Sequence, residues 1–422
     1  MTSVTRLACQ RRYLCGSMKG KTMRKIVIVV SAALVAVAAI WLLFRPLIEW
    51  PFGWQDLPKP QPARVAEATD AKYARLQAFL SEQYASGRYP SLSAAVSIDG
   101  KIVWSSAMGY ADLRTLVPAT TRSQYRIGSS SKAVNATLAA ILVNQGRLDV
   151  DAPITRYIDY FPEKGSPITT RQLLSHTAGI RHYGVCFCAP IWDYENTRHF
   201  DSVEAAVATF ADSPLLFKPG TSFSYSSYGT VLSSGVLEAA GGKSYLTLIQ
   251  QQVAAPLGLA GLSADDRIIP DDHRVRPYEL ADGRFRDALA TDDSIKWAGG
   301  GFVAAPEDLA KLGGAWITNA LFPPEVRTAF WTPQPLADGT PNPQNYAMGW
   351  RVGEVVLDDG TKVRVVHHNG TAKGAASSFM LFPDYGIAVS VMTNKGIQGG
   401  KDPFQGFAET LGLLIVTDDA TD

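Results

Sequence analysis

RIGSSSK, from Arg126 to Lys132, opens a segment whose apolar residues recur at helical spacing until Gly146. Residues three or four positions apart face each other on a helix, whereas residues one or two positions apart do not. Of the three serines before Lys132, Ser129 alone stands three positions away from it. The spacing therefore predicts that the Ser129 hydroxyl and the Lys132 amine lie one helical turn apart and can share a proton.

This pair has the chemistry of a nucleophile and its base. A serine on the first helical turn lies beside unpaired backbone N–H groups and the positive end of the helix dipole, which favour a developing oxyanion. Serine is a weak nucleophile unless a neighbour takes its proton, and burial lowers the pKa of a lysine so that its amine can do so. A serine-rich helix start is also typical of a simple N-cap, so Ser129 and Lys132 by themselves leave both interpretations open.

Strand patterns lie on both sides of this helix, near the two ends of the chain. Residues 92–98 and 102–108 are joined by Asp99-Gly100, a pair typical of a tight hairpin. Between them and the C-terminal strands, residues 129–345 have mainly helical and loop patterns. We therefore expect an α+β protein with one antiparallel sheet built from both chain ends, flanked by helices, plus a helical lobe. The C-terminal strands are predicted at residues 352–357, 362–368, 377–382 and 387–393, followed by a helix at 404–415.

The N-terminus has the pattern of a membrane anchor. Residues 1–25 carry seven basic residues and no acidic one, and residues 26–44 form an uncharged apolar run. As a helix this run would rise about 28 Å, close to the ~30 Å hydrocarbon core of a bilayer. The positive-inside rule then predicts a single pass through the inner membrane, with a cytoplasmic tail and the rest of the chain on the outer, periplasmic face.

Two other interpretations of the N-terminus remain. A cleaved signal peptide has a shorter apolar region followed by a small-residue cleavage site, whereas this run ends in Trp41-Leu42-Leu43-Phe44-Arg45-Pro46. A basic, acid-free N-terminus also fits a mitochondrial import signal with a sorting helix. The predicted parts of the chain are a basic tail at 1–25, a transmembrane anchor at 26–44, a proline-rich linker at 45–65, a domain at 66–416 that begins with a helix at 66–87, and a tail at 417–422.

Composition narrows the classes of function. The 422 residues are 46% hydrophobic and 19% charged, with a net charge of +1, which excludes a mainly disordered chain and argues against a nucleic-acid binder. Four cysteines cannot form a disulfide framework at this length. Cys186 and Cys188 have a single residue between them. This spacing is unfavourable for a disulfide between the two, and we interpret them as loop thiols. A zinc site from His176, His182 and Cys186 fits no usual tetrahedral spacing.

Several segments after the RIGSSSK helix match one known family in the family's own order. They are GRLDVDAP (146–153), ITTRQLLSHTAGI (168–180), FSYSS (223–227), AGGGF (298–302) with PEDL (306–309), and HNG (368–370). Together they resemble the penicillin-binding-protein and class C β-lactamase-like serine hydrolases over about residues 65–415. In motif style the chain is most similar to the mitochondrial β-lactamase-like proteins. The resemblance implies a β-lactamase/transpeptidase-like fold, no metal and no cofactor.

The resemblance also assigns roles to individual residues. Tyr225 would lie near Ser129 and Lys132, where a phenol beside an ammonium has a lowered pKa and can exchange a proton. Ser227 replaces the family's asparagine; its hydroxyl can still bind Lys132 but cannot supply both an amide donor and an amide acceptor.

Further family positions fall on the HNG segment and on one histidine. His368 replaces the lysine that attracts a substrate carboxylate, and histidine is only partly charged near neutral pH, so we expect poor β-lactam hydrolysis. The motif's glycine is Gly370. The backbone N–H of Thr371 would be the second oxyanion donor beside that of Ser129. His176, in the LLSHTAG segment, is expected to be structural, with its ring bound to backbone.

The sequence thus predicts a membrane-anchored serine hydrolase. Ser129 would form an acyl-enzyme with an ester or amide bond of a small-molecule or peptide substrate, and Lys132 and Tyr225 would handle the proton. Two alternatives stay open: a non-catalytic tethered sensor or scaffold, and a true β-lactamase or D-Ala-D-Ala carboxypeptidase. The oligomeric state, the physiological substrate and any role of the two loop cysteines do not follow from the sequence.

Overall fold

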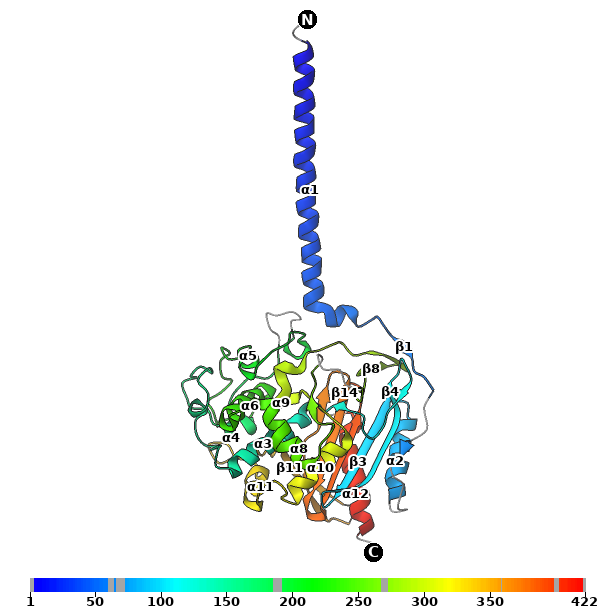
Figure 1. Cartoon of the computed structure of the whole chain (residues 1–422), viewed down its shortest axis with the longest axis vertical. Helices are drawn as coiled ribbons and strands as arrows, with labels where there is room; N and C mark the ends of the chain where they lie inside the picture. The colour runs from blue at the N-terminus through cyan, green and yellow to red at the C-terminus, as the bar shows by residue number, and fades with distance from the viewer. Residues whose placement is uncertain are drawn as a thin grey trace. The chain divides into compact units, whose positions relative to one another are not determined.

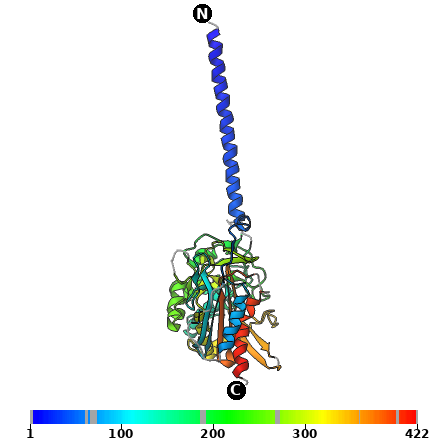
Figure 2. The ribbon, with the colours of Figure 1, turned by 90° about the vertical axis from the view of Figure 1, so that its right-hand side faces the viewer.

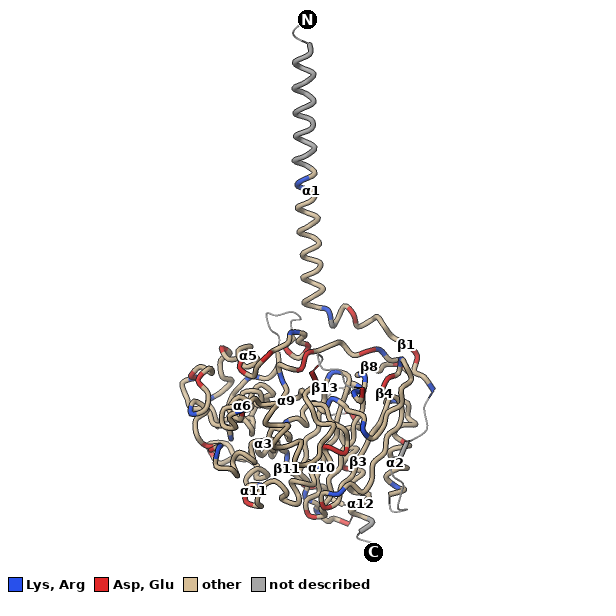
Figure 3. Tube along the Cα trace, viewed as in Figure 1, with Lys and Arg blue, Asp and Glu red and all other residues tan. Residues whose placement is uncertain are grey.

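A computed structural model describes residues 4–59, 64–65, 73–184, 192–266, 272–357, 359–397 and 402–419. It divides into two units. One unit contains the long helix α1 (Val4–Glu49), in which the segment Met23–Arg45 is long and apolar enough to cross a membrane. Phe44 leaves helical backbone geometry, and the helix continues beyond it, so the first residues of the predicted linker are helical. In Figure 3 the stretch of α1 between its two blue, basic positions is tan, without charged residues.

The second unit, residues 53–184 and 194–422, is built on an antiparallel sheet to which both ends of the chain contribute. The sheet order is β11-β12-β14-β15-β3-β4-β2, with β13 paired to β14 and β5 to β4. This confirms the expected α+β class and the sheet made from both termini. The strands are β2 (Arg64–Val65), β3 (Ser91–Ile98), β4 (Lys101–Asp112), β5 (Val117–Pro118), β11 (Arg351–Val356), β12 (Lys362–His367), β13 (Gly370–Ala372), β14 (Ala375–Phe382) and β15 (Ile387–Thr393).

The hairpin between β3 and β4 forms where the sequence predicts it. Asp99 and Gly100 have positive φ values of 48° and 78°, as a two-residue turn that follows the strand twist requires. The pairing of Ile98 with Lys101 closes the hairpin. Side chains then alternate between the two faces of the sheet, because the strand period is two residues.

Helices cover both faces of the sheet. Helices α2 (Ala74–Ala85) and α12 (Phe407–Asp419) pack against each other over one face, as Figures 1 and 2 show in blue and red. Helix α10 (Pro306–Ile317) packs on the other face. Its contact is close because Gly313 and Gly314 face the sheet: a Cβ at Gly313 would lie 2.7 Å from the Ala388 Cβ atom. Helix α2 covers residues 74–85 of the helix predicted at 66–87, of which residues 66–72 lie outside the described part of the chain. The C-terminal helix continues to Asp419, beyond the predicted end at residue 415.

The remaining helices form a lobe beside the sheet. They are α3 (Ser131–Asn144), α4 (Thr170–Leu174), α5 (Val203–Val207), α6 (Ser227–Gly241), α7 (Tyr245–Leu248), α8 (Ala255–Leu257), α9 (Trp297–Gly300) and α11 (Pro324–Trp331). Two small sheets that the sequence did not predict accompany them, β1 (Gln55–Asp56) with β9 (Arg284–Asp287) and β8 (Tyr278–Ala281), and β6 (Tyr125–Arg126) with β10 (Phe302–Ala304) and β7 (Ser263–Ala264).

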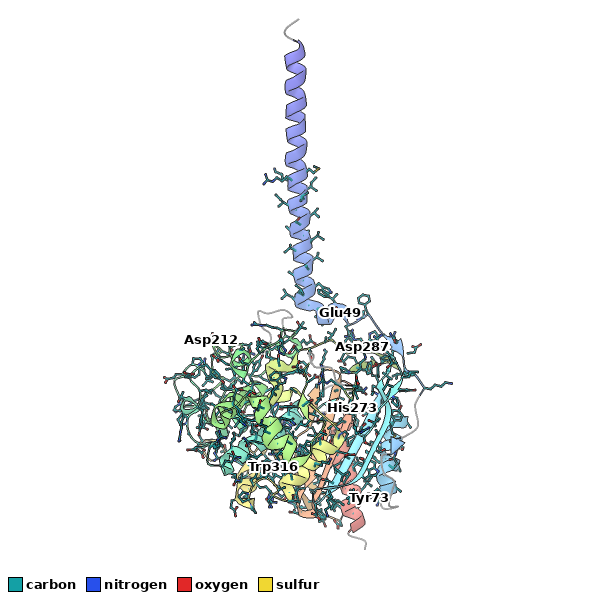
Figure 4. The ribbon with its side chains drawn as sticks, viewed as in Figure 1. Glu49, Tyr73, Asp212, His273, Asp287 and Trp316 are labelled. Atoms are coloured by element: carbon teal, nitrogen blue, oxygen red, sulfur yellow. The ribbon has the colours of Figure 1, made fainter. Side chains whose placement is uncertain are left out.

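Trp316, labelled in Figure 4, joins the sheet-covering helix α10 to the lobe. Its indole N–H donates to the Thr137 hydroxyl of α3 across 2.8 Å. Its ring stacks on that of Trp331, with centroids 5.7 Å apart. Since the indole is fully buried, this contact holds α3 against α10, and the turn that precedes α3 contacts β13 and β14 of the sheet.

Candidate active site

The candidate nucleophile lies in a 3₁₀ turn, Gly128–Ser130, that leads into α3. Gly128 has φ +50°, and a Cβ atom there would lie 2.5 Å from the Thr371 carbonyl oxygen. A Cβ at Gly370 would in turn overlap the Ile127 carbonyl oxygen. Only glycines at these two positions let the turn lie directly against β13, which explains the glycine of the HNG segment.

Hydrogen bonds separate the three serines of the segment. Ser130 donates to the His368 carbonyl oxygen across 2.6 Å. Ser131 accepts the Phe302 backbone N–H at 3.2 Å. Both side chains are fully buried, whereas the Ser129 hydroxyl lines a cavity of about 400 Å³. The structure therefore selects the same serine as the helical spacing does.

Lys132 is buried, with 1% of its surface exposed. Its Nζ atom lies 2.9 Å from Ser227 Oγ, 3.3 Å from Ser129 Oγ, and within a short hydrogen bond of the Gly299 carbonyl oxygen. Burial lowers the pKa of the Lys132 amine well below its usual value, and repulsion from Arg351 and Lys296 lowers it further. This direction confirms the expected effect of burial on Lys132.

A charged Lys132 amine would donate to all three of these oxygens, and the neutral form that burial favours would use them differently. A neutral amine has two N–H donors and one lone pair. The Gly299 carbonyl oxygen can only accept a hydrogen bond, and the Ser227 hydroxyl can accept the second. The lone pair is then left for the Ser129 hydroxyl, which is the arrangement that a general base requires.

Tyr225 is brought to the site as expected, but its pKa moves in the opposite direction from the prediction. Burial raises the pKa of the phenol, and this outweighs the lowering effects of the Arg351 charge and of a hydrogen bond with Ser129. Lys132 Nζ lies over the face of the Tyr225 ring, 4.8 Å from its centroid. The sequence argument assumed a charged lysine beside the phenol, whereas burial favours the neutral forms of both groups.

His368 also requires a correction. Its ring is fully buried and does not line the cavity. Its Nδ1 atom lies 2.9 Å from the Asn369 carbonyl oxygen, so Nδ1 carries the hydrogen and Nε2 accepts the Tyr346 hydroxyl at 2.8 Å. Burial lowers the pKa of His368 well below its usual value, and Arg351 and Lys132 lower it further. The histidine is thus neutral, not partly charged, and does not present a positive charge to a substrate.

Two more predicted residues, Ser227 and Thr371, line the cavity that also contains Ser129. Ser227 begins α6 and binds Lys132. Thr371 is exposed and lines the same cavity as Ser129; its role as an oxyanion donor stays a prediction. His176 is buried, and its Nδ1 atom accepts the Ser226 backbone N–H at 3.3 Å, which confirms a ring bound to backbone.

The zinc alternative gains no support. Among the described residues no group of three or more histidine, cysteine, aspartate or glutamate side chains could hold a metal ion. His182 instead accepts the Ser227 backbone N–H at 3.1 Å. Cys186 and Cys188 lie outside the described residues.

Sequence reasoning missed three parts of the site. The first is the Gly299 carbonyl, which binds Lys132; a Cβ at Gly299 would lie 2.9 Å from Ser227 Cβ, so the AGGGF run was the available signal. The second is Arg351, whose guanidinium lies 5.3 Å from the centroid of the Tyr225 ring. The third is the remaining cavity wall, which is formed by His182, Tyr183, Tyr194, Lys296 and Gly300.

Comparisons with known proteins identify the family and the fold of the chain. A family model described as Beta-lactamase matches residues 76–410. The chain is 28% identical over 378 residues to "Serine beta-lactamase-like protein LACTB, mitochondrial" of Homo sapiens, covering 70% of this chain and 69% of that protein. It is 27% identical over 372 residues to "Esterase EstB" of Burkholderia gladioli, covering 78% and 92%. The solved D-amino acid amidase of Ochrobactrum anthropi SV3 has the same fold, with a TM-score of 0.69 and 21% identity over 83% of this chain and 100% of that chain.

Proposed function

The chain belongs to the Beta-lactamase family of serine hydrolases, and we propose that it hydrolyses ester or amide bonds through an acyl-enzyme on Ser129. The observation that carries this proposal is the buried Lys132 amine, whose Nζ atom lies within hydrogen-bond distance of the Gly299 carbonyl oxygen, the Ser227 hydroxyl and the Ser129 hydroxyl. A scaffold without catalysis would have no need to bury a lysine in this way, since an unpaired buried amine is unfavourable.

The first half of the reaction forms the acyl-enzyme. The Ser129 proton moves to Lys132 while Ser129 Oγ bonds to the substrate carbonyl carbon, and the carbonyl electron pair moves to its oxygen. The backbone N–H groups of Ser129 and Thr371 stabilise that oxyanion. When the tetrahedral intermediate collapses, the bond to the leaving group breaks. The leaving oxygen or nitrogen takes a proton through the Tyr225 phenol, which the protonated Lys132 replenishes.

The second half releases the acid. Water attacks the acyl carbon and gives a proton to Tyr225 or Lys132, and a second oxyanion forms in the same place. Its collapse breaks the bond to Ser129 Oγ, which takes back a proton. No net proton or electron is gained or lost by the protein in the full cycle.

The proposed substrates are small esters and amides, including peptide-like amides. The family relatives support both bond types, because one is named an esterase and a protein of the same fold is named a D-amino acid amidase. A neutral, buried His368 lacks the charge that would attract a β-lactam carboxylate, so β-lactam or D-Ala-D-Ala carboxypeptidase activity is the weaker candidate.

The proposed location is a membrane surface. The apolar segment Met23–Arg45, preceded by the basic tail, supports a single-pass anchor with the hydrolase domain on the outer, periplasmic face. A mitochondrial location is the alternative, since the human relative is named as mitochondrial.

Covalent labelling tests the nucleophile. The full chain in detergent is treated with a fluorophosphonate probe, and p-nitrophenyl acetate turnover is followed in parallel. Ser129→Ala should abolish both signals, whereas Ser131→Ala, in which the neighbouring serine lacks its hydroxyl, should keep the labelling. Labelling that persists in Ser129→Ala would overturn the assignment. Turnover by the unchanged chain no faster than by Ser129→Ala would favour the scaffold.

A further inference from the structure

Arg351 places a charge beside the proposed proton-transfer groups. It begins β11 and pairs with His367 of β12. Its guanidinium lies over two aromatic rings, 5.3 Å from the Tyr225 centroid and 5.2 Å from the Tyr346 centroid. Its Nε and Nη2 atoms donate to the Gln344 side-chain oxygen at 3.3 and 3.0 Å. Within the described part of the chain, no carboxylate forms an ion pair with it.

The second cation near Lys132 is different. Lys296 lines the cavity, but its Nζ atom lies 3.2 Å from the Asp293 carboxylate, and both side chains are buried. The carboxylate offsets part of the Lys296 charge, so Lys296 contributes less to the repulsion of the Lys132 amine than an unpaired cation would. Arg351 keeps its full charge, since the amide of Gln344 is neutral.

The remaining groups that face Lys132 carry no charge that could offset that of Arg351. Tyr225 lies under the Lys132 amine, and burial raises its pKa. His176 and His368, which follow α4 and β12, are buried with pKa values well below the usual value, each lowered in part by Lys132. All three are neutral at neutral pH.

We propose that Arg351 is a positioning residue whose charge, held over Tyr225, adds to the effect of burial in keeping the Lys132 amine unprotonated and able to accept the Ser129 proton. This inference rests on the proposed function for its kinetic consequence. The guanidinium acts on the Lys132 amine electrostatically, through space, from its position against the Tyr225 ring. The cation–π contacts with Tyr225 and Tyr346 hold the charge in place.

The pH dependence of kcat/KM tests the inference. In the full chain, the acid limb of the profile reports protonation of Lys132. Arg351→Gln removes the repulsion, so Lys132 binds its proton at higher pH, and the acid limb should move up by on the order of one pH unit. That is roughly a tenfold loss of kcat/KM on the acid side, with little loss on the plateau. Arg351→Lys keeps the charge and should leave the limb near its original pH.

A second variant changes the charge without removing the arginine. Gln344→Glu places a carboxylate on the atoms that Arg351 already binds, and it should move the acid limb in the same direction as Arg351→Gln. The matched control is Arg364→Gln. Arg364 is an exposed arginine on the next strand, β12, and its guanidinium lies over the Trp331 ring. Its replacement should leave the acid limb of the kcat/KM profile unmoved. An equal loss of activity at every pH in Arg351→Gln, or an equal limb shift in Arg351→Lys, would overturn the inference.

A direct titration separates this inference from the proposed function. The chain is labelled with [ε-¹³C]lysine, and the Lys132 signal is assigned by its loss in Lys132→Ala. Its NMR titration should move to higher pH in Arg351→Gln and in Gln344→Glu. If the chain had no turnover but the titration moved, the proposed function would fail while the role of Arg351 stood. An unmoved titration would reject that role whatever the activity.

Discussion

The Lys132 amine nitrogen lies 2.9 Å from the Ser227 hydroxyl oxygen, and this contact joins α3 to the first residue of α6. The Ser227 hydroxyl stands where the family has an asparagine, and it accepts a hydrogen bond from the lysine. It orients the amine but offers no amide to a substrate.

Ser227→Ala should therefore lower kcat with little change in KM. The variant leaves one N–H of Lys132 without its partner, and loss of one hydrogen bond of this kind corresponds to about 1 kcal/mol, or roughly a fivefold decrease in kcat. Steady-state kinetics with p-nitrophenyl acetate measure kcat and KM of the variant and of the unchanged chain. A change confined to KM would indicate that Ser227 contacts the substrate instead.

Tyr225→Phe should lower kcat by about 10²- to 10⁴-fold, the usual range for loss of a proton-transfer group, because it removes the phenol that hydrogen-bonds with Ser129. Fluorophosphonate labelling should slow less than turnover, since the leaving group of the probe needs less help from an acid. The control is Tyr245→Phe, in which the lost hydroxyl is buried and has no hydrogen-bond partner within the described residues. Equal effects of the two changes would remove Tyr225 from the mechanism.

Gly128→Ala should reduce activity strongly and stability by about 1–3 kcal/mol, because the new Cβ would meet the Thr371 backbone. The turn that carries Ser129 must then move away from β13. Gly165 offers a matched control: its φ of +73° is also left-handed, but a Cβ there meets nothing within 4 Å. Gly165→Ala should cost about 1 kcal/mol and leave kcat intact. Thermal unfolding and turnover of both variants test this prediction: a loss of turnover that is equal in Gly128→Ala and Gly165→Ala would contradict it.

His367 should make the fold less stable in mild acid. Burial, together with the Arg351 charge, lowers the pKa of His367 to about 4, whereas in the unfolded chain it is about 6.5. Between these values the unfolded state binds more protons, so stability is complete above pH 6.5 and falls as the pH is lowered towards 4. The full loss from this residue is at most about 3 kcal/mol.

His367→Gln should flatten that pH dependence. The measurement is the melting temperature at pH 7 and at pH 4.5 for the two proteins. A slope should remain in the variant, because His176 and His368 are also buried with lowered pKa values. Identical slopes in both proteins would show that His367 is not buried as described.

The sequence predicted the elements that depend on near neighbours. The 92–98 and 102–108 strands were predicted within a few residues because Asp99-Gly100 joins them. The choice of Ser129 among three serines followed from helical spacing, and the hydrogen bonds of Ser130 and Ser131 agree with it. The small strands of the two minor sheets escaped prediction, since two to four residues carry too little periodicity to recognise.

The failures at the site concern burial. The sequence argument gave Tyr225 a lowered pKa and His368 a partial charge; the structure reverses the direction for Tyr225 and makes His368 neutral. Residue type fixes the ordinary pKa of a group, but desolvation and neighbouring charges decide which way it moves. Those depend on segments that are distant in the chain, such as Tyr346 over His368 and Arg351 over Tyr225.

The amino-acid sequence by itself determined the main strands near both chain ends and the closeness of Ser129 to Lys132, because each of these depends on residues that are near one another in the chain. Only the tertiary structure decided the state of the amine. Gly299, in α9, is 167 residues away from Lys132 along the chain, and Arg351 lies on β11. Which backbone carbonyl meets a side chain, and how much water remains around it, depends on the packing of the whole domain.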